Sequence, residues 1–438
     1  MKAVIMAGGK GTRLRSVSEE LPKPMVPVLG KPILEYQVGM LRRYGIRDIV
    51  IITGYKAKYI HDYFGDGSSF SVNISYINED EPLGTAGALY YLRDQIDEDF
   101  LLLMGDLMMS VDVDRFMEAH KKGGGMATLF VHPNSHPHDS DVILTDTEGK
   151  LSDFGEDLWG QGKRPGLSEE TRTVRGVLSK NGKRDDFCHN MVNAGIYAFK
   201  PEILDLITGP VKQDLDKDVI RPLIPLGEVM VYHSTEYVKD MGTPERYEAV
   251  SRDIASGLVE ARNLSHRQKA IFLDRDGTLN EYRGFIRDPE ELKLIDGAAE
   301  AVRLINSSEY LAIVITNQPV VARGEVSFSG LDRIHAKLET ELGKEGAFLD
   351  DLFYCPHHPD SGFEGEVKEL KFSCSCRKPG VGMLLLAAEK YNIDLSGSYM
   401  IGDSPSDGEC GKNAGLHTIL IDRDSGEGLL EAVRSILK

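Results

Sequence analysis

The sequence predicts an α/β protein in which two domains, each built on a largely parallel sheet, follow one another along 438 residues. Two segments of the same kind support this. Residues 3–6 form an apolar strand that runs into a glycine-rich turn, and residues 270–273 form another that runs into an acidic turn. After each of them, short apolar runs alternate with helical patterns, as is typical of a parallel sheet with crossover helices.

The apolar runs place the expected strands and the domain boundary. In the first half they lie at 49–53, 100–104, 127–131, 194–199 and 229–232, and in the second at 270–273, 311–315, 351–354, 399–401 and 417–421. Residues 246–267 between the halves read as a polar, mainly helical stretch with little to bury. We therefore expect a first domain over 1–250, a linker over 251–268 and a second domain over 269–438.

Composition excludes several classes of function. The balance of 51 basic against 69 acidic residues gives a net charge of −18, which argues against general binding of nucleic acid or of anionic membrane. Phosphorylated small molecules remain, because Mg²⁺ and a few local cations can hold them. No apolar run is long enough to span a bilayer, and the first residues lack a secretory pattern, so we expect a cytoplasmic protein. Five cysteines do not make a disulfide framework.

The first half carries a glycine loop and a cation held between prolines. Gly8 and Gly9 follow directly on a strand, where backbone N–H groups can approach phosphate oxygens closely. Lys23 stands between Pro22 and Pro24, whose fixed φ angles stiffen the stretch. Taken singly, each is also what an ordinary turn or a surface lysine would look like.

Two carboxylates follow strand-like segments in the same half. Asp106 ends the apolar run 101–104, and loops at the carboxyl ends of parallel strands are where α/β ligand sites form. Asp240 is a candidate second ligand for the same ion.

Together these motifs resemble the sugar-1-phosphate nucleotidyltransferases, in order, over residues 1 to about 250. The matching stretches are GGKGTRL, PKPM, GTAG at 84–87, GD at 105–106, NAGIY at 193–197 and DMGTPE at 240–245. The resemblance implies a Rossmann-like fold with a mixed, mainly parallel sheet. It also implies that a sugar 1-phosphate is condensed with a nucleoside triphosphate, releasing pyrophosphate. The roles it implies are nucleotide binding by Gly8, Gly9, Gly11, Thr12 and Gly84, catalysis by Arg13 and Lys23, Mg²⁺ binding by Asp106 and Asp240, and sugar-phosphate binding by Gly87 and Asn193.

The polar segment 161–189 departs from that family. Many members carry Glu-Lys-Pro before the NAGIY stretch, with the lysine on the sugar phosphate, whereas this chain has only Lys163-Arg164-Pro165. Lys163 is our first choice for the replacement cation. The segment has two open interpretations, a surface insertion and a basic lid over an anionic ligand.

The second half begins with two carboxylates two residues apart. Asp274 and Asp276 follow a strand, so that period-2 geometry points them to the same side. One can then attack phosphorus while the other protonates the leaving oxygen and later activates water. Two aspartates at this spacing are common by chance, so the other polar residues at strand ends decide whether the pair is catalytic. They are Thr316, Asn317, Arg377, Lys378 and Asp403.

That order resembles the haloacid-dehalogenase-like phosphatases, which have a Rossmannoid fold. The resemblance implies Asp274 as nucleophile and Asp276 as general acid and base. It implies Mg²⁺ at a site formed by Asp274, Asp276 and Asp403. Asp407 is interpreted as an orienting or solvated carboxylate rather than a second essential ligand. Substrate contacts are expected from Thr316, Asn317, Arg323, Arg377 and Lys378.

Three of the five cysteines cluster with histidines late in the chain. Cys355, His357, Cys374 and Cys376 form a set of soft ligands that suits tetrahedral Zn²⁺, and we expect a closed structural site. Two alternatives stay open: His358 as the ligand in place of His357, and four residues merely scattered on a loop. Cys188 and Cys410 are interpreted as unpaired thiols.

The motifs FLDRDGTLN, TNQPVVARGE, CPHHPDSG and CSCRKPGVGM resemble the heptose-bisphosphate phosphatases over nearly all of 269–438. The histidinol-phosphate phosphatases share these motifs and are the main competitor. One departure is Pro319-Val320-Val321, where a commoner form has Ser or Ala with Gly-Ile, so substrate contacts near Arg323 are expected to differ.

The fusion of the two halves narrows the function. A phosphatase that converts D-glycero-D-manno-heptose 1,7-bisphosphate to the 1-phosphate makes the kind of substrate that a nucleotidyltransferase needs. The stretch GTRLRSVSEELPKPMVPV resembles the heptose-1-phosphate guanylyltransferases. The ADP-heptose route uses a nucleotidyltransferase of a different fold, so the resemblance favours the GDP-heptose route and its α anomer. The product then serves lipopolysaccharide or S-layer glycan synthesis.

We therefore expect a bifunctional enzyme whose partners are small molecules, heptose phosphates and GTP, with neither nucleic acid nor membrane. A homo-oligomer is left open. Three rival functions remain. They are a mannose- or glucose-1-phosphate nucleotidyltransferase fused to an unrelated phosphatase, a histidinol phosphatase, and a sugar-nucleotide sensor with an inactive N-terminal half.

Overall fold

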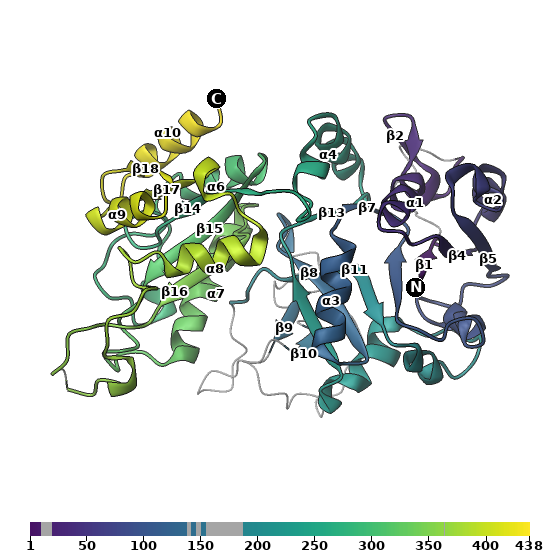
Figure 1. The fold of residues 1–438 in the computed structure, drawn as a ribbon, viewed down its shortest axis with the longest axis horizontal. Coiled ribbons are helices and arrows are strands. Elements are labelled where there is room, and N and C mark those ends of the chain that lie inside the picture. The colour runs from purple at the N-terminus through teal and green to yellow at the C-terminus, as the bar shows by residue number, and fades with distance from the viewer. Residues whose placement is uncertain (10–19, 138–141, 146–149, 155–186, 363) are drawn as a thin grey trace. The chain divides into compact units, whose positions relative to one another are not determined.

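The computed structural model describes residues 1–9, 20–137, 142–145, 150–154, 187–362 and 364–438 (Figure 1). The chain divides into two compact units. Unit 1 consists of Met1–Val131, Ile143–Phe154 and Asn193–Asn263, and unit 2 of His132–Val142, Gly155–Val192 and Leu264–Lys438. Of the described residues, unit 2 thus takes in 132–137, 142 and 187–192 from the first half of the sequence.

Unit 1 is built on a seven-stranded sheet with the order β12-β8-β11-β6-β1-β4-β5. Strand β1 pairs in parallel with β4 and β6, whereas β11 runs antiparallel to β6. The expected mixed, mainly parallel sheet is therefore confirmed. The strands are β1 (Lys2–Met6), β4 (Asp48–Thr53), β5 (Asn73–Asn78), β6 (Phe100–Met104), β8 (Ala127–His132), β11 (Val192–Phe199) and β12 (Val229–His233).

Smaller antiparallel pairs flank this sheet. One of them, β7 with β13, sets Asp240 opposite Leu107, directly after Asp106. The sequence pattern did not predict these short strands, since two to four residues are too few for a periodicity to register. They are β2 (Pro27–Val28) with β3 (Lys31–Pro32), β7 (Leu107–Ser110) with β13 (Tyr237–Asp240), and β9 (Ile143–Thr145) with β10 (Leu151–Phe154).

The longer helices of the first half bury an apolar stripe, as α1 shows. In α1, Leu34, Val38 and Leu41 recur at helical spacing and pack in one core cluster with residues of β1. The expectation that 246–267 has little to bury is wrong at Val250 and Val259, which are buried with Val26 and Met108. The helices are α1 (Ile33–Arg43), α2 (Ala57–Phe64), α3 (Val113–Gly123), α4 (Pro244–Ala255) and α5 (Leu258–Ala261).

Unit 2 is built on a five-stranded parallel sheet with the order β16-β15-β14-β17-β18 (Figure 1). Alternate residues of the central strand enter different cores, Ile271 and Leu273 on one face and Ala270 and Phe272 on the other. Helical residues complete both cores, so the sheet lies between two helical layers. The strands are β14 (Lys269–Leu273), β15 (Tyr310–Asn317), β16 (Asp351–Cys355), β17 (Tyr399–Gly402) and β18 (His417–Leu420).

Each face of this sheet has its own helices. Buried residues of α6 (Ala298–Asn306), α7 (Phe328–Lys344) and α10 (Gly426–Ile436) lie in the core cluster of Ile271 and Leu273. Buried residues of α8 (Gly382–Tyr391) and α9 (Pro405–Asn413) lie in the cluster of Ala270 and Phe272. None of the helices in the described part of the chain combines the length and the apolar character that crossing a bilayer requires.

Within unit 2, the segment 187–190 contacts α7 through an imidazole. His189 Nδ1 lies 2.7 Å from Glu339 Oε1, and His189 Nε2 lies 3.1 Å from Asp332 Oδ1. Burial lowers the pKa of His189, but the two carboxylates outweigh burial, so the net pKa is raised well above 6.5. The rest of the proposed insertion or lid, including Lys163, lies outside the described residues, as do Gly11, Thr12 and Arg13.

Candidate active sites and metal centre

The glycine loop of unit 1 begins at the carboxyl end of β1, and the carboxylate of Glu79 lies next to it. A Cβ on Gly8 would collide with Oε2 of Glu79, which follows β5. The other oxygen of Glu79 accepts a hydrogen bond of 3.0 Å from the backbone N–H of Leu83, and burial raises the pKa of this carboxyl group. Sequence reasoning missed Glu79, because nothing in an acidic stretch at 79–81 marks one carboxylate as inward-facing.

Lys23 and Asp106 meet at the carboxyl end of β6. Lys23 lies in a 3₁₀ turn, Lys23–Met25, with Pro22 before it and Pro24 within it. Its ammonium group contacts the carboxylate of Asp106 directly. The sequence predicted both residues separately, and the structure brings them together.

Asp240 belongs to the same charge cluster. Nη1 of Arg246, in α4, lies 2.8 and 3.1 Å from its two oxygens, and the backbone N–H of Gly242 donates to it at 2.7 Å. Burial raises the pKa of Asp240, but the charges of Arg246 and Lys23 outweigh burial and lower it. Carboxylate oxygens of this kind suit a hard cation such as Mg²⁺. Arg246 gave no signal in the sequence beyond its place after a helix start.

Gly84 and Gly87 are required by close backbone approach. Gly84 has φ +78°, and a Cβ there would collide with the carbonyl oxygen of Gln213. A Cβ on Gly87 would collide with the carbonyl oxygen of Val211. The glycines of the GTAG stretch therefore have a packing reason that is independent of any ligand. Asn193 donates to the Tyr197 hydroxyl at 2.9 Å.

The second site gathers at the carboxyl ends of β14, β15 and β17. Lys378 is buried, and its Nζ lies 2.7 Å from Asp274 Oδ1 and 2.7 Å from Asp407 Oδ1. It also donates to the carbonyl of Ile315 at 2.9 Å. Burial raises the pKa of Asp274 to about 7, against the opposing charge of Lys378. The pKa of Lys378 is raised, because its two carboxylate partners outweigh burial.

Three carboxylates of unit 2 are placed to share an ion. Oxygens of Asp274, Asp403 and Asp407 lie within 4.8 Å of one another, a donor set that fits Mg²⁺. The structure brings Asp407, not the side chain of Asp276, into this group. Asp407 is fully buried and fixed by the capping box at the start of α9, where its Oδ2 accepts from Ser404 N–H at 3.0 Å and from Ser404 Oγ at 2.6 Å.

Asp276 is held by other donors. Arg275 donates to both of its oxygens, while Asn280 donates to Oδ1 at 3.0 Å and Gln318 to Oδ2 at 2.8 Å. The guanidinium group of Arg423 contacts Asp403. Sequence reasoning assigned no role to Arg275, Asn280, Gln318 or Arg423.

The remaining predicted substrate residues fall into three environments. Thr316 is buried at the end of β15, and Gln318 Nε2 donates to its Oγ1 at 2.8 Å. Asn317 and Lys378 exchange side chain-to-backbone hydrogen bonds of 3.0 and 3.1 Å. Arg323 lies over the Phe285 ring at 4.8 Å and donates to Glu325, and Arg377 donates to the carbonyl of His357 at 3.3 Å.

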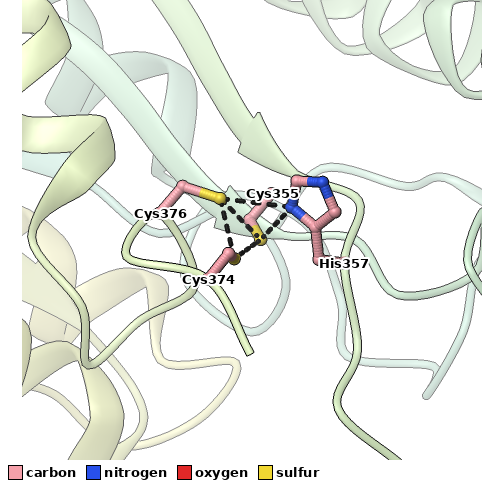
Figure 2. Close-up of side chains that lie close together, drawn as sticks. All are labelled: Cys355, His357, Cys374 and Cys376. Carbon is pink, nitrogen blue, oxygen red and sulfur yellow. Dashed lines mark hydrogen bonds between the residues drawn. The ribbon is translucent and has the colours of Figure 1, made fainter. Parts of the chain in front are cut away.

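The cysteine cluster forms a compact four-residue group (Figure 2). Its neighbouring sulfur and Nδ1 atoms lie between 2.9 and 3.6 Å apart, close enough for all four to bind one ion. Burial and the hydrogen bond with Cys376 raise the pKa of Cys355, which a bound cation would offset. His358 is not in the group and accepts from the Asp360 N–H instead. The group consists of Cys355, His357, Cys374 and Cys376.

The fold and the two sites are those of a class of protein in which a nucleotidyltransferase unit is joined to a haloacid-dehalogenase-like phosphatase unit. Comparison with known proteins agrees. The chain belongs to the nucleotidyl transferase family, whose family model matches residues 2–257, and a HAD-hydrolase-like family model matches residues 375–432.

Curated relatives match one half or the other. A UTP–glucose-1-phosphate uridylyltransferase from Synechocystis is 31% identical over 52% of this chain, which spans 56% of that relative. A mannose-1-phosphate guanylyltransferase from Mycobacterium tuberculosis is 28% identical over 62% of this chain and 70% of its own length. A D-glycero-beta-D-manno-heptose-1,7-bisphosphate 7-phosphatase from Rhodopseudomonas palustris is 38% identical over 39% of this chain and 91% of its own length. The C-terminal part belongs to the family of this last relative.

Proposed function

We propose that this chain carries out two consecutive steps of GDP-heptose synthesis. The C-terminal half removes the phosphate at carbon 7 of D-glycero-D-manno-heptose 1,7-bisphosphate. The N-terminal half joins the resulting 1-phosphate to GMP from GTP. The observation that carries the proposal is the union of a nucleotidyl transferase over residues 2–257 with a close relative of a heptose-bisphosphate 7-phosphatase. The product of one half is then the substrate of the other.

In the phosphatase step, Asp274 is the nucleophile. Its carboxylate oxygen forms a bond to phosphorus while the bond from phosphorus to the sugar oxygen breaks, and Asp276 gives that oxygen a proton. Water then attacks the aspartyl phosphate, loses its proton to Asp276 and releases phosphate. Lys378, 2.7 Å from Asp274, orients the nucleophile and offsets the charge of the phosphoryl group. A divalent cation on Asp274, Asp403 and Asp407 would neutralise further phosphoryl charge when bound.

In the transfer step, an oxygen of the sugar 1-phosphate attacks the α-phosphorus of GTP, the bond to the β-phosphate breaks, and pyrophosphate leaves. The protein forms no covalent bond, so positioning and charge neutralisation carry the catalysis. Lys23 supplies positive charge at the end of β6, and Asp106 and Asp240 are the proposed ligands of a divalent cation.

The environment of Gly8 supports GTP as the nucleotide. Glu79 presents a carboxylate beside the loop that we propose binds the nucleotide: its Oε2 faces Gly8, and its Oε1, which accepts from Leu83 N–H, keeps a second lone pair. The Watson–Crick edge of guanine carries adjacent N–H donors at N1 and N2, and a carboxylate can accept from both. Uracil and thymine offer a single N–H on that edge, so they match a carboxylate less well.

We also propose that the cysteine cluster binds Zn²⁺ as a structural ion. Three thiolates and one imidazole are ligands that zinc prefers, and four protein ligands leave no open position for catalysis. Small phosphorylated molecules are the proposed partners, and the cytoplasm, where nucleoside triphosphates are made, is the proposed location.

A ³¹P NMR time course with GTP and Mg²⁺ tests the proposal, with the α and β anomers of the heptose bisphosphate in separate samples. We expect inorganic phosphate first, then pyrophosphate and a diphosphate diester with the α anomer. Asp274→Asn should abolish phosphate release and spare pyrophosphate release from added heptose 1-phosphate. Asp106→Asn should have the opposite effect.

Other outcomes contradict the proposal. Faster pyrophosphate release with mannose or glucose 1-phosphate than with heptose 1-phosphate favours a hexose enzyme. Phosphate release from histidinol phosphate but not from either heptose bisphosphate favours the histidinol phosphatase. Nucleotide binding with no pyrophosphate from any sugar phosphate favours a sensor.

A further inference from the structure

Arg275 lies between the two aspartates of the phosphatase site, and its long side chain is turned into the protein. It is only 1% exposed, which makes it one of the largest fully buried side chains of the described residues. A guanidinium group is expensive to bury unless a carboxylate pairs with it and hydrogen bonds satisfy it. We therefore expect a carboxylate next to the buried guanidinium group.

That partner is the neighbouring aspartate, Asp276. Arg275 Nε lies 3.1 Å from Asp276 Oδ1, and Nη2 lies 2.8 Å from both Oδ1 and Oδ2. Asn280 and Gln318 donate one further bond each, to Oδ1 and Oδ2 respectively. Both oxygens of the carboxylate are thus held, from residues before and after it in the chain and from the end of β15.

Among the described residues, no second carboxylate lies within hydrogen-bond reach of the other side of the guanidinium group. Arg275 Nη1 is buried without a hydrogen-bond partner among the described residues, and so is Nε2 of His335 on α7. Burial, and then the charge of Arg275, lower the pKa of His335 well below its ordinary value, so this imidazole stays neutral. Among the described residues, the side chain of Arg275 therefore forms its ion pair with Asp276 alone.

Gln318 extends this arrangement to the phosphate-binding side. Its Nε2 lies 2.8 Å from Asp276 Oδ2 and 2.8 Å from Thr316 Oγ1. Gln318 therefore links the carboxyl group of Asp276, the proposed proton donor to the leaving oxygen, with the hydroxyl of Thr316. That hydroxyl lies at the end of β15, where the phosphoryl group is expected to bind.

We propose that Arg275 is a positioning residue for phosphoryl transfer. With Asn280 and Gln318, it holds the Asp276 carboxyl group in the orientation from which a proton reaches the leaving oxygen as the bond from phosphorus to that oxygen breaks. This inference rests on the proposed phosphatase activity, but it does not depend on which sugar is the substrate.

Aryl phosphates with leaving groups of different acidity test it. A phenol leaves slowly without a proton, whereas p-nitrophenol leaves readily as the anion. For Arg275→Met we expect kcat/KM to fall about 100-fold with phenyl phosphate, the usual contribution of a general acid, and less than about fivefold with p-nitrophenyl phosphate. Asp276→Asn should show the same dependence on the leaving group, and Arg275→Lys should lie between wild type and Arg275→Met.

Arg434→Met is the matched control. Arg434 is exposed, pairs with Glu300 at 2.9 Å and belongs to the same unit, so its loss should leave both rates unchanged. Should Arg275→Met fail to fold, Gln318→Met removes one donor from Asp276 and should give a smaller effect with the same preference for the good leaving group.

Thermal unfolding without Mg²⁺ provides a second readout. Asp276→Asn leaves the buried Arg275 without its counter-charge, so it should lower the unfolding temperature more in the wild-type background than in Arg275→Met. Additive effects would contradict the pairing.

The kinetic outcomes separate this inference from the proposed function. Equal falls with both aryl phosphates, or no fall, would overturn the positioning role. The absence of a leaving-group effect in Asp276→Asn would overturn it as well. Hydrolysis of aryl phosphates without hydrolysis of heptose bisphosphate would contradict the proposed substrate alone. A wild-type chain that hydrolyses neither contradicts both.

Discussion

The ammonium group of Lys378 lies 2.7 Å from a carboxylate oxygen of Asp274. The lysine stands two residues after Cys376, a member of the four-residue cysteine cluster, within a segment closed by the hydrogen bond of 2.8 Å from Gly382 N–H to the Ser375 carbonyl. The cysteine cluster and the lysine of the second site therefore belong to one short segment of the chain, although the two centres have different chemistry.

Replacing Lys378 tests this relationship at the catalytic end. In Lys378→Met, Asp274 and Asp407 face each other without the cation between them, and the nucleophile loses its orienting donor. We expect phosphate release to fall by about 10³-fold or more, as for other lost oriented donors, and nucleotidyl transfer to be unchanged. Lys269→Met, which removes an exposed pair with Glu309 at 2.8 Å in the same unit, should retain full activity. Less than a fivefold loss in Lys378→Met would contradict the assignment.

Replacing a cysteine tests the relationship at the structural end. Cys374→Ser should lower the zinc content, measured by elemental analysis, and should lower the unfolding temperature of unit 2, because structural zinc sites supply folding free energy. Phosphate release should fall with it, since the turn that carries Lys378 loses its anchor. His358→Ala is the matched control and should keep one zinc ion per chain. Loss of zinc in His358→Ala with retention in His357→Ala would reverse the ligand assignment.

Glu79 is expected to set the choice of nucleotide. In Glu79→Gln, one acceptor oxygen becomes an NH₂ donor, which faces guanine N–H groups unfavourably and suits the donor–acceptor edge of uracil. We expect kcat/KM for GTP to fall about 10- to 100-fold and the ratio of UTP to GTP use to rise, on the scale of one lost bidentate contact. Pyrophosphate release with each nucleotide measures this. An equal loss for both nucleotides would indicate that Glu79 only supports the loop through Leu83.

The pair of His189 with Glu339 predicts a pH-dependent stability of unit 2. The pKa of His189 is raised in the folded state, because Glu339 and Asp332 outweigh burial. The contribution of the His189 pair to the free energy of unfolding is thus fully present below the pKa of histidine in the unfolded chain, about 6.5. It is lost as the pH rises through the higher pKa of the folded state. Thermal unfolding of wild type and His189→Gln from pH 5.5 to 9 should show the largest difference at low pH. A difference that grows with pH would contradict this.

The sequence alone determined the features that depend on local pattern and residue chemistry. Apolar runs placed the strands of both main sheets except β5, because buried parallel strands read as continuous apolar segments. The ligand types predicted the metal group of Cys355, His357, Cys374 and Cys376, whose four donor atoms the structure brings together. The positions of Asp106 and Asp274 after apolar strands predicted the two sheet edges at which charge gathers.

Only the tertiary structure decided which side chains face one another there. The spacing predicted Asp276 on the same side as Asp274, and the family resemblance implied that both bind Mg²⁺ with Asp403, yet the Asp276 carboxylate pairs with the buried Arg275. Asp407 takes that place because the first turn of α9 fixes its carboxylate. Glu79 lies against Gly8 because β1, β4 and β5 are neighbours in the sheet. These contacts join residues far apart in the chain, or depend on the burial of one charge. A local sequence pattern predicts neither the order of the strands in a sheet nor which guanidinium group will be buried.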